Sequence, residues 1–266
     1  MNLHKLYLTN NACYKAGVTM TPKGIMVHST GANNPWLKRY IAPDDGLLGT
    51  NSAGNHWNTA YPAGLSVCVH AFIGKLADGT LATYQTLPWT FRGWHAGGTA
   101  NNSYIGFEIC EDALDDPAYF SAVYQEALEL CVYLCGQYQL TEADILCHSE
   151  GYTLSIASNH ADVMHWFPKF GKNMDMFRAD VKAALSEQED DTMTQEKFDL
   201  LMANWLQRNN PTYATLAQVP EYWRAETKAL MDAGAIKGDG TTELGLQRET
   251  LKAAIINKRY ADGLLE

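Results

Sequence analysis

The stretch GIMVHST, at Gly24–Thr30, sets the first expectation for the fold. Small and apolar residues lead to a histidine, and polar residues follow at once. A short apolar run that ends in this way is typical of a buried β-strand. We therefore place His28 at the carboxyl end of a strand, where side chains from neighbouring strands can meet.

Three other segments extend this strand into a sheet. LSVCVHAFIGKLADGTLATYQTL, at Leu65–Leu87, predicts a hairpin whose tight turn is supplied by Asp78 and Gly79. YIGFEICED, at Tyr104–Asp112, is another β-rich run. ADILCHSE, at 143–150, predicts a short strand that delivers His148.

The clearest helix follows Asp115 and Asp116, either of which can cap it, with Pro117 in the first turn. Its apolar residues recur at helical spacing. They are Tyr119, Phe120, Val123, Tyr124, Ala127, Leu128, Cys131, Leu134 and Cys135. A last helix is expected over Met174–Leu185. Strands and helices are mixed, so we predict an α/β domain built around a central mixed β-sheet flanked by helices.

The composition changes after residue 185. SEQEDDTMTQ, at 186–195, is acidic and polar without apolar periodicity, which indicates a linker. Residues 196–266 predict a small all-α domain of three helices. The first helix is expected at 196–207, the second ends near Gly234, and the third is expected at 247–260. The predicted organisation is thus a domain at 1–185, a linker at 186–195 and a helical domain at 196–266.

The bulk composition excludes several classes of protein. The chain has 266 residues, 46% of them hydrophobic, and a net charge of −10. This balance argues against a nucleic-acid binder and against a basic membrane-surface protein. No apolar run is long enough for a membrane span, and the polar N-terminus predicts no secretory signal. The cysteines show no C-x-x-C pair, and we expect buried free thiols, including Cys68, Cys110, Cys131 and Cys135.

A metal site can be built from side chains at the predicted strand ends. Two imidazoles, from His28 and His148, and a carboxylate such as Asp162 leave the fourth tetrahedral position of zinc open. Glu108 lies between Phe107 and Ile109, so it points to the opposite face of its strand. It is either a general base of raised pKa or a glutamate that faces solvent, and spacing alone leaves both interpretations open.

A resemblance to a known family favours the first interpretation. MVHST, VHAFIGKLADGTLATYQTLPW, GWHAGG, NNSYIGFEICED and ILCHSEG…NHADVMHWF occur in the order seen in zinc-dependent N-acetylmuramoyl-L-alanine amidases of the amidase-2 family. This family shares its fold with peptidoglycan-recognition proteins. The resemblance covers about residues 20–185.

The resemblance implies a role for each matching residue. His28 and His148 match the first two zinc ligands, Asp162 matches the third, and Glu108 matches the catalytic glutamate. His160 takes the basic position two residues before the third ligand, where it can donate a hydrogen bond to the oxyanion. His160 as the ligand itself is the alternative, which we rank below Asp162.

The same resemblance implies a substrate groove. His70 and His95 match residues that line it, and we expect Trp94 and Trp166 beside them, with packing as the other interpretation for Trp166. Some members carry a tyrosine where this chain has Val69, so Glu108 must act as the base alone.

The resemblance implies cleavage of the amide between N-acetylmuramic acid and L-alanine of peptidoglycan. We expect a phage or prophage endolysin, made in the host cytoplasm and acting on the cell wall after release. The C-terminal domain resembles one S-layer-homology repeat, which predicts binding to secondary cell-wall polymer or a homo-oligomer. The alternatives are a non-catalytic peptidoglycan-binding protein of this fold and a cytosolic muropeptide-recycling amidase.

Overall fold

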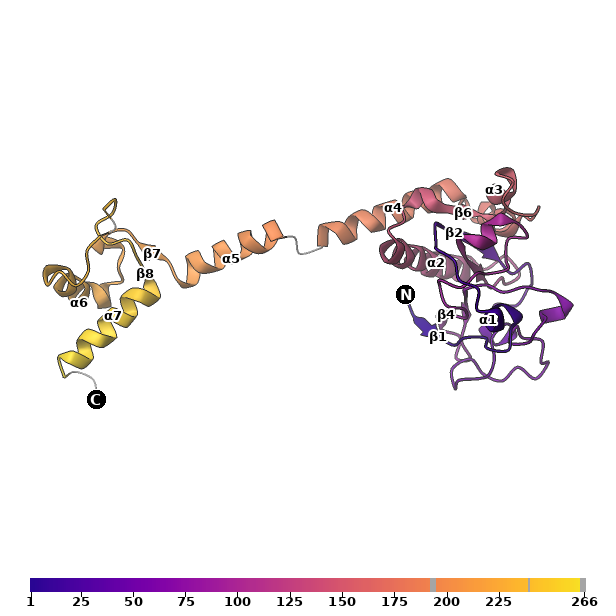
Figure 1. Cartoon of the computed structure of the whole chain (residues 1–266), viewed down its shortest axis with the longest axis horizontal. Coiled ribbons are helices and arrows are strands. Elements are labelled where there is room, and N and C mark those ends of the chain that lie inside the picture. Colours follow the sequence, from indigo (N-terminus) through magenta and orange to yellow (C-terminus); the bar gives the residue numbers. More distant parts are fainter. Residues whose placement is uncertain (192–194, 239, 264–266) are drawn as a thin grey trace. The chain divides into compact units, whose positions relative to one another are not determined.

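A computed structural model describes residues 1–191, 195–238 and 240–263 (Figure 1). These residues form two compact units, Met1–Asp190 and Asp191–Glu266, each of which is described by itself. The boundary falls inside the segment 186–195 that the sequence predicts as a linker. Residues 186–191 continue a helix there, and residues 192–194 of the predicted linker lie outside the described residues.

The first unit is built on a six-stranded sheet with the order β1-β4-β3-β5-β2-β6. All neighbouring strands run parallel except β3 and β4, which form the predicted hairpin around Asp78 and Gly79. The mixed central sheet is therefore confirmed. The strands are β1 Leu3–Lys5, β2 Gly24–Ser29, β3 Ala71–Lys75, β4 Leu81–Gln85, β5 Tyr104–Ile109 and β6 Ile145–Cys147.

One face of the sheet is covered by α2 Pro117–Tyr138 and α4 Met174–Asp191 (Figure 1). The Asp116 carboxylate accepts hydrogen bonds from the first-turn N–H groups of Ala118 and Tyr119, which starts α2 as the sequence predicts. Alternate residues of β2, β3 and β5 pack on these helices in the larger core, because successive side chains of a strand point to opposite faces.

The other face is covered by loops and short helices. Phe72 and Tyr84 pack there with residues of the 34–57 loop, and Met26 packs with Ala96 and Ala100. The short helices are α1 Ala12–Ala16, α3 His148–Thr153 and the 3-10 turns Leu37–Arg39, Pro62–Gly64, Thr99–Asn102, Glu142–Asp144, Asp162–His165 and Phe167–Phe170. This thinner cover leaves room for polar side chains at the strand ends.

The second unit contains α5 Gln195–Asn209, α6 Glu221–Asp232 and α7 Arg248–Ala261, with a 3-10 turn at Leu216–Gln218. Its core gathers Val219, Trp223, Leu251 and Ile255. The all-α prediction needs one correction, because Thr212–Tyr213 (β7) and Leu246–Gln247 (β8) pair as an antiparallel ladder. Two-residue strands show no alternation in sequence. Among the described residues, no helix has the length and apolarity needed to cross a membrane.

The expectation that Cys68 is a free thiol is wrong. Cys13, in α1, forms a disulfide with Cys68 across 55 residues of sequence. Cys110, Cys131 and Cys135 are buried free thiols as expected, and so is Cys147. The bond joins a surface helix to the segment before β3, a long-range contact that local apolarity does not indicate.

The disulfide should stabilise the first unit by restricting its unfolded chain. For a loop of this length the entropic model gives about 4 kcal/mol. We expect the double variant Cys13→Ser, Cys68→Ser to lose up to this amount of unfolding free energy in denaturant titration. Reductant should lower the stability of the wild type and leave the double variant unchanged. A wild type with six reactive thiols after unfolding without reductant would contradict the pairing.

Candidate metal centre

The register of β2 and β5 places His28 directly opposite Glu108. Residues paired in this way on parallel strands point to the same face of the sheet. Phe107 and Ile109 point to the other face, into the core under α2, as their alternation with Glu108 predicts. A basic and an acidic group are thereby fixed side by side at the strand ends.

Two further elements bring His148 and Asp162 to the same place. β6 pairs with β2 and ends at Cys147, so His148 begins α3 beside His28. Asp162 begins a 3-10 turn and has a φ of 44°, in the left-handed region that aspartate tolerates better than most residues. The strained backbone directs the carboxylate at the two imidazoles.

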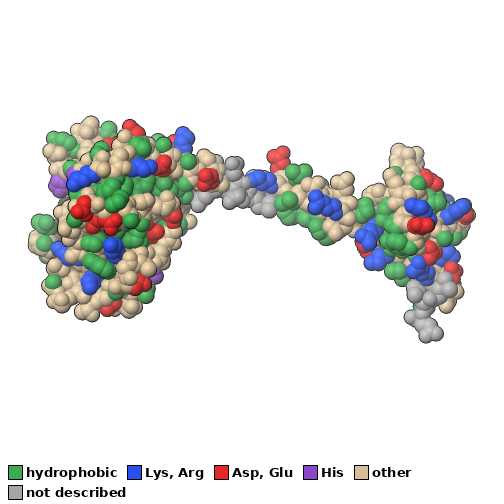
Figure 2. Space-filling model, turned by 180° about the vertical axis from the view of Figure 1, so that it is seen from behind, with side chains coloured by type: hydrophobic (Ala, Val, Ile, Leu, Met, Phe, Trp, Pro, Cys, Tyr) green, Lys and Arg blue, Asp and Glu red, His purple; other side chains and the backbone are tan. Residues whose placement is uncertain are grey.

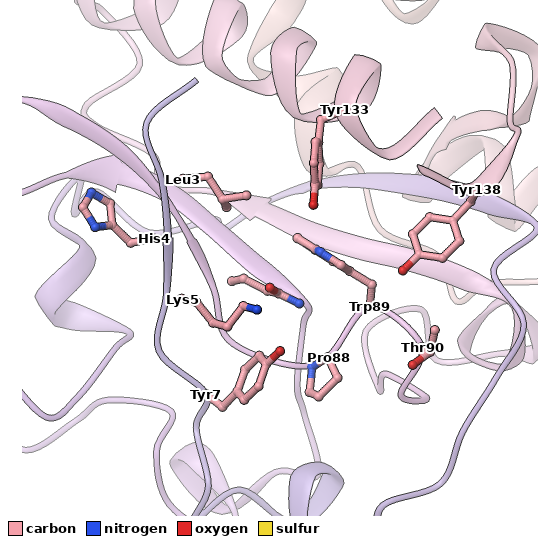
Figure 3. Close-up of a pocket in the computed structure, with 10 residues that line it drawn as sticks. Leu3, His4, Lys5, Tyr7, Pro88, Trp89, Thr90, Tyr133 and Tyr138 are labelled. Carbon is pink, nitrogen blue, oxygen red and sulfur yellow. The ribbon is translucent and has the colours of Figure 1, made fainter. Parts of the chain in front are cut away.

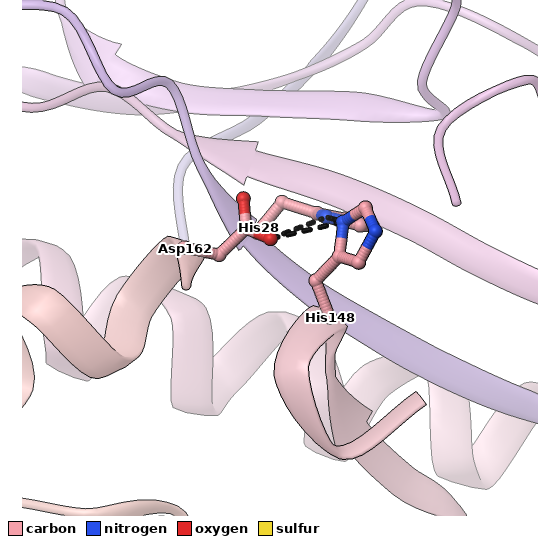
Figure 4. Close-up of side chains that lie close together, drawn as sticks. All are labelled: His28, His148 and Asp162. Atoms are coloured by element: carbon pink, nitrogen blue, oxygen red, sulfur yellow. Dashed lines mark hydrogen bonds and ion pairs between the residues drawn. The ribbon is translucent and has the colours of Figure 1, made fainter. Parts of the chain in front are cut away.

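Three ligand atoms converge at this point (Figure 4). Nδ1 of His148 lies 3.2 Å from Nδ1 of His28. Oδ2 of Asp162 lies 2.9 Å from Nδ1 of His148 and 3.6 Å from Nδ1 of His28. Ligand atoms about 2.0–2.1 Å from a tetrahedral zinc ion are about 3.3 Å apart. Oδ2 of Asp162 is buried and has no hydrogen-bond partner of good geometry despite these contacts. The donor set and its spacing fit a bound metal ion.

Hydrogen bonds behind the imidazoles fix which nitrogen is free. Nε2 of His95 lies 3.1 Å from the carbonyl oxygen of Tyr104, to which it can only donate. Nδ1 of His95 is then an acceptor, and Nε2 of His28, 2.9 Å away, donates to it. The lone pair on Nδ1 of His28 is therefore left for a metal, since a neutral imidazole carries one proton.

The same logic applies to His148. Oγ of Ser158 lies 3.3 Å from the carbonyl oxygen of Ala96, to which it donates. Nε2 of His148, 3.1 Å from that Oγ, donates in turn, so the tautomer of a neutral imidazole has its lone pair on Nδ1. Sequence reasoning missed Ser158, which is one serine among many without a local signal.

The close packing of His95 behind His28 depends on Gly106. A Cβ built at Gly106 would lie 2.5 Å from Cγ of His95, closer than real atoms approach. Burial and the neighbouring His28 and His70 hold the pKa of His95 well below its usual value. Burial likewise lowers the pKa of His28, so both rings are neutral and suited to metal coordination.

Glu108 carries a strongly perturbed carboxyl group. Burial, with further contributions from Asp162 and Glu111, raises its pKa well above the usual value for glutamate. Its side chain is half-buried, but Oε2 is fully buried and has no hydrogen-bond partner among the described residues. Glu111 is itself buried and lies 3.0 Å from Nε2 of His165. An unpaired carboxylate beside a metal-ligand set is a strong candidate for proton transfer.

Asp162 shows the opposite behaviour. Burial raises its pKa, but the contacts with His148 and His28 outweigh burial and hold the pKa below the ordinary value for aspartate. The two carboxyl groups of the site therefore differ in environment, one kept ionised by imidazoles and one pushed toward the neutral form. Such a divergence is how one site separates a ligand from a base.

The remaining predicted residues separate into two groups. His160 is exposed, with its ring centre 4.7 Å from that of His148, and Trp94 is also exposed. The groove-lining role predicted for His70 and Trp166 is wrong, because both are fully buried. His95 lies behind His28, and both of its ring nitrogens are hydrogen-bonded, so in this structure it supports His28.

Each buried side chain has a clear structural role. His70 joins the 91–94 segment to β5, because its Nε2 lies 2.7 Å from the carbonyl oxygen of Phe91 and its Nδ1 accepts from the N–H of Gly106. Trp166 packs against Phe120, with ring centres 5.6 Å apart, under α2. Both positions depend on non-local packing that a short motif does not reveal.

Comparisons with known proteins identify the family of the chain. Residues 18–165, more than half of the chain, match the family described as N-acetylmuramoyl-L-alanine amidase. N-acetylmuramoyl-L-alanine amidase XlyA of Bacillus subtilis (strain 168) is 28% identical over 160 residues, which are 56% of this chain and 43% of that protein. The chain thus matches less than half the length of this curated relative.

Two solved structures are also similar to part of this chain. The catalytic domain of XlyA is 24% identical and has a TM-score of 0.47, covering 68% of this chain and 99% of that one. PlyL is 19% identical and has a TM-score of 0.47, covering 68% of this chain and 96% of that one.

The geometry predicts that Asp162, and not His160, holds a metal. We expect Asp162→Ala to weaken zinc binding at least about 100-fold, and His95→Phe to weaken it by about 10–100-fold through loss of the partner of His28. His160→Ala is the matched control and should keep the affinity of the wild type. Competition titration with a chromogenic chelator measures all three. A site emptied by His160→Ala alone would make the assignment wrong.

Proposed function

The chain belongs to the N-acetylmuramoyl-L-alanine amidase family, and we propose that its first unit hydrolyses the amide between N-acetylmuramic acid and L-alanine in peptidoglycan. The observation that carries this proposal is the convergence of two imidazoles and one carboxylate beside Glu108. An unpaired, half-buried carboxyl group next to a metal-ligand set suits hydrolysis of an unactivated amide.

We propose zinc as the metal, held by His28, His148 and Asp162. Nitrogen and carboxylate ligands with one open position are typical of catalytic zinc. A zinc ion supplies Lewis-acid polarisation of a carbonyl and makes water more acidic. The hydrogen bonds from His95 and Ser158 hold the two imidazoles in the tautomer that this role requires.

Glu108 is the proposed general base. Its carboxylate accepts a proton from the attacking water and passes it to the nitrogen of the leaving L-alanine. Burial raises the pKa of Glu108, which brings it closer to neutrality and makes both transfers easier. Glu108 shares a face of the sheet with His28, so the base and the metal ligands reach the same small volume.

We propose that His160 and Trp94 border this volume from the solvent side. We propose that His160 donates a hydrogen bond to the oxygen that gains charge as the amide carbonyl is attacked. Trp94 has the guanidinium of Arg92 4.7 Å above its ring and offers an aromatic surface to the substrate. Both side chains are exposed and can meet a polymer that is too large to enter a closed pocket.

We propose that the whole protein is a phage or prophage endolysin that acts on the cell wall after release. The second unit resembles one S-layer-homology repeat, and we propose that it binds a secondary cell-wall polymer or associates with a second copy. Support for association comes from an apolar stripe on α5 (Figure 2). Its residues recur at helical spacing and are exposed by between 39% and 56%: Phe198, Leu201, Met202, Trp205 and Leu206.

Activity should depend on Glu108 more than stability does. We expect Glu108→Gln to slow the clearing of purified cell walls by about 10²–10⁴-fold while zinc remains bound. Asp115→Asn, an exposed acidic change nearby in sequence, is the control and should keep wild-type activity. A Glu108→Gln protein that clears walls at the wild-type rate would exclude the proposed base.

The same variant tests the pKa of Glu108 in metal-free protein. Because the folded pKa is raised, the stability that the proton contributes is fully present below the unfolded value of about 4.3 and is lost as pH rises toward the folded value. Glutamine avoids this loss. The unfolding temperature of Glu108→Gln should therefore exceed that of the wild type by more at pH 8 than at pH 4.

The α5 stripe predicts a concentration-dependent dimer. Leu201→Asp places a charge in the stripe and should give a mass near the 29.5 kDa of one chain in light scattering. Gln207→Asp puts the same charge on the opposite side of the helix and should leave the dimer intact. A monomeric wild type across the accessible concentration range would rule out self-association.

A further inference from the structure

A cavity lies beside the edge of the sheet opposite to the edge strand that leads to His148. It has a volume of about 400 Å³, within the usual range of small-molecule sites. β1 forms one edge of the sheet and β6, which leads to His148, forms the other. The cavity is lined by Leu3, His4, Lys5, Tyr7, Gln85, Pro88, Trp89, Thr90, Tyr133 and Tyr138.

Aromatic side chains from three segments form its walls (Figure 3). Tyr133 and Tyr138 come from α2, Trp89 from the loop after β4, and Tyr7 from the segment after β1. Their rings surround a common space, and burial together with Tyr133 and Tyr7 raises the pKa of Tyr138. Aromatic faces of this kind pack well against the apolar faces of a ring-shaped ligand.

The same side chains present polar groups that the protein leaves unused. Among the described residues, none forms a hydrogen bond with the hydroxyl groups of Tyr7, Tyr133 or Tyr138, or with the indole N–H of Trp89. Four potential donors thus border one cavity with aromatic walls. This combination suits a ligand that is rich in hydroxyl groups and carbonyl oxygens, since each donor can be satisfied on binding.

The cavity also carries one positive charge. Lys5 pairs with Gln85 in the β1–β4 register, so both point to the α2 side of the sheet. The Lys5 ammonium forms no ion pair with a carboxylate of the described residues and lies 5.8 Å from the ring centre of Tyr7. Two glutamates of α2 are occupied elsewhere: Glu126 binds Asn2 and Thr83, and Glu129 binds the N-terminal ammonium.

We propose that this cavity is a non-catalytic binding site for a pyranose sugar that carries a carboxylate. The aromatic walls take the sugar ring, the unpaired hydroxyl groups bind its oxygen atoms, and Lys5 binds the carboxylate. An uncharged sugar would leave the Lys5 ammonium without a partner, so the site should bind a sugar with a carboxylate more tightly than an uncharged sugar.

Two sources of such a sugar exist in a cell wall. One part of the proposal rests on the proposed function: amide hydrolysis consumes water, releases the L-alanine amine and leaves a free lactyl carboxylate on muramic acid. The cavity would then hold strands from which peptides have already been removed. The other source is an acidic wall polysaccharide that contains uronic acid.

Titration of the ¹⁵N-labelled, zinc-loaded full chain tests the site. N-acetylmuramic acid and glucuronic acid are the charged probes, and N-acetylglucosamine is the uncharged one. We expect a charged probe to shift the amide resonances of Lys5, Tyr133 and Tyr138 with a dissociation constant in the millimolar range. Lys5→Met should weaken that binding by about tenfold, as loss of a charge-assisted hydrogen bond implies, and leave N-acetylglucosamine unaffected. The tighter charged probe identifies the source.

Controls separate this cavity from the metal centre. Lys23→Met removes an exposed lysine elsewhere and should bind as the wild type does. Tyr138→Phe removes one hydroxyl group while keeping the ring and should weaken binding of both charged probes. The proposal is overturned if only Trp94 and its neighbours shift, if N-acetylglucosamine binds as tightly as the charged sugars, or if Lys5→Met has no effect. Monosaccharide binding needs no catalysis, so a protein that fails to clear cell walls refutes the proposed function and not this site.

Discussion

The parallel pairing of β2 with β5 is the constraint on which the site depends. It sets His28 opposite Glu108, and it sets Val27 and Phe107 on the other face, where α2 buries them. A slip of one residue would exchange the two faces of a strand, placing a carboxylate in the core and an aromatic ring in the site. The apolar packing under α2 therefore fixes the register, and the register fixes the chemistry.

A second level of order lies in the hydrogen bonds behind the ligands. His95 and Ser158 each end a chain of donors at a backbone carbonyl, so the proton positions on His28 and His148 follow from the fold. Gly106, in β5, has no Cβ and therefore leaves space for the ring of His95. The absence of a side chain at this position thus allows the hydrogen bond that sets the tautomer of His28 in β2. The polar groups of the site are thus prepared by residues that a substrate does not reach.

The sequence predicted the elements that have a strong local period. The hairpin at Asp78 and Gly79, α2 with a cap at Asp115 or Asp116, and the face occupied by Glu108 all follow from the sequence pattern. It did not predict β1, a three-residue strand without alternation, or the bond between Cys13 and Cys68. The burial of His70 and Trp166 and the role of Ser158 also depend on partners far away in the chain. Residues near a motif share its neighbourhood in sequence, but only tertiary packing decides which of them face solvent.

The balance of charge at the strand ends explains why these groups belong together. Glu108, Asp162 and Glu111 are partly or fully buried close to one another, and burial also disfavours a positive charge on His28 beside them. Without a cation the repulsion among these carboxyl groups favours protonation of one of them, and the raised pKa of Glu108 makes its carboxyl group the favoured proton acceptor. A divalent ion between His28, His148 and Asp162 would remove that need and leave Glu108 ionised and unpaired. The cluster of carboxyl groups that repel one another in the metal-free chain is therefore the one that would favour binding of a divalent ion, with Glu108 free beside it.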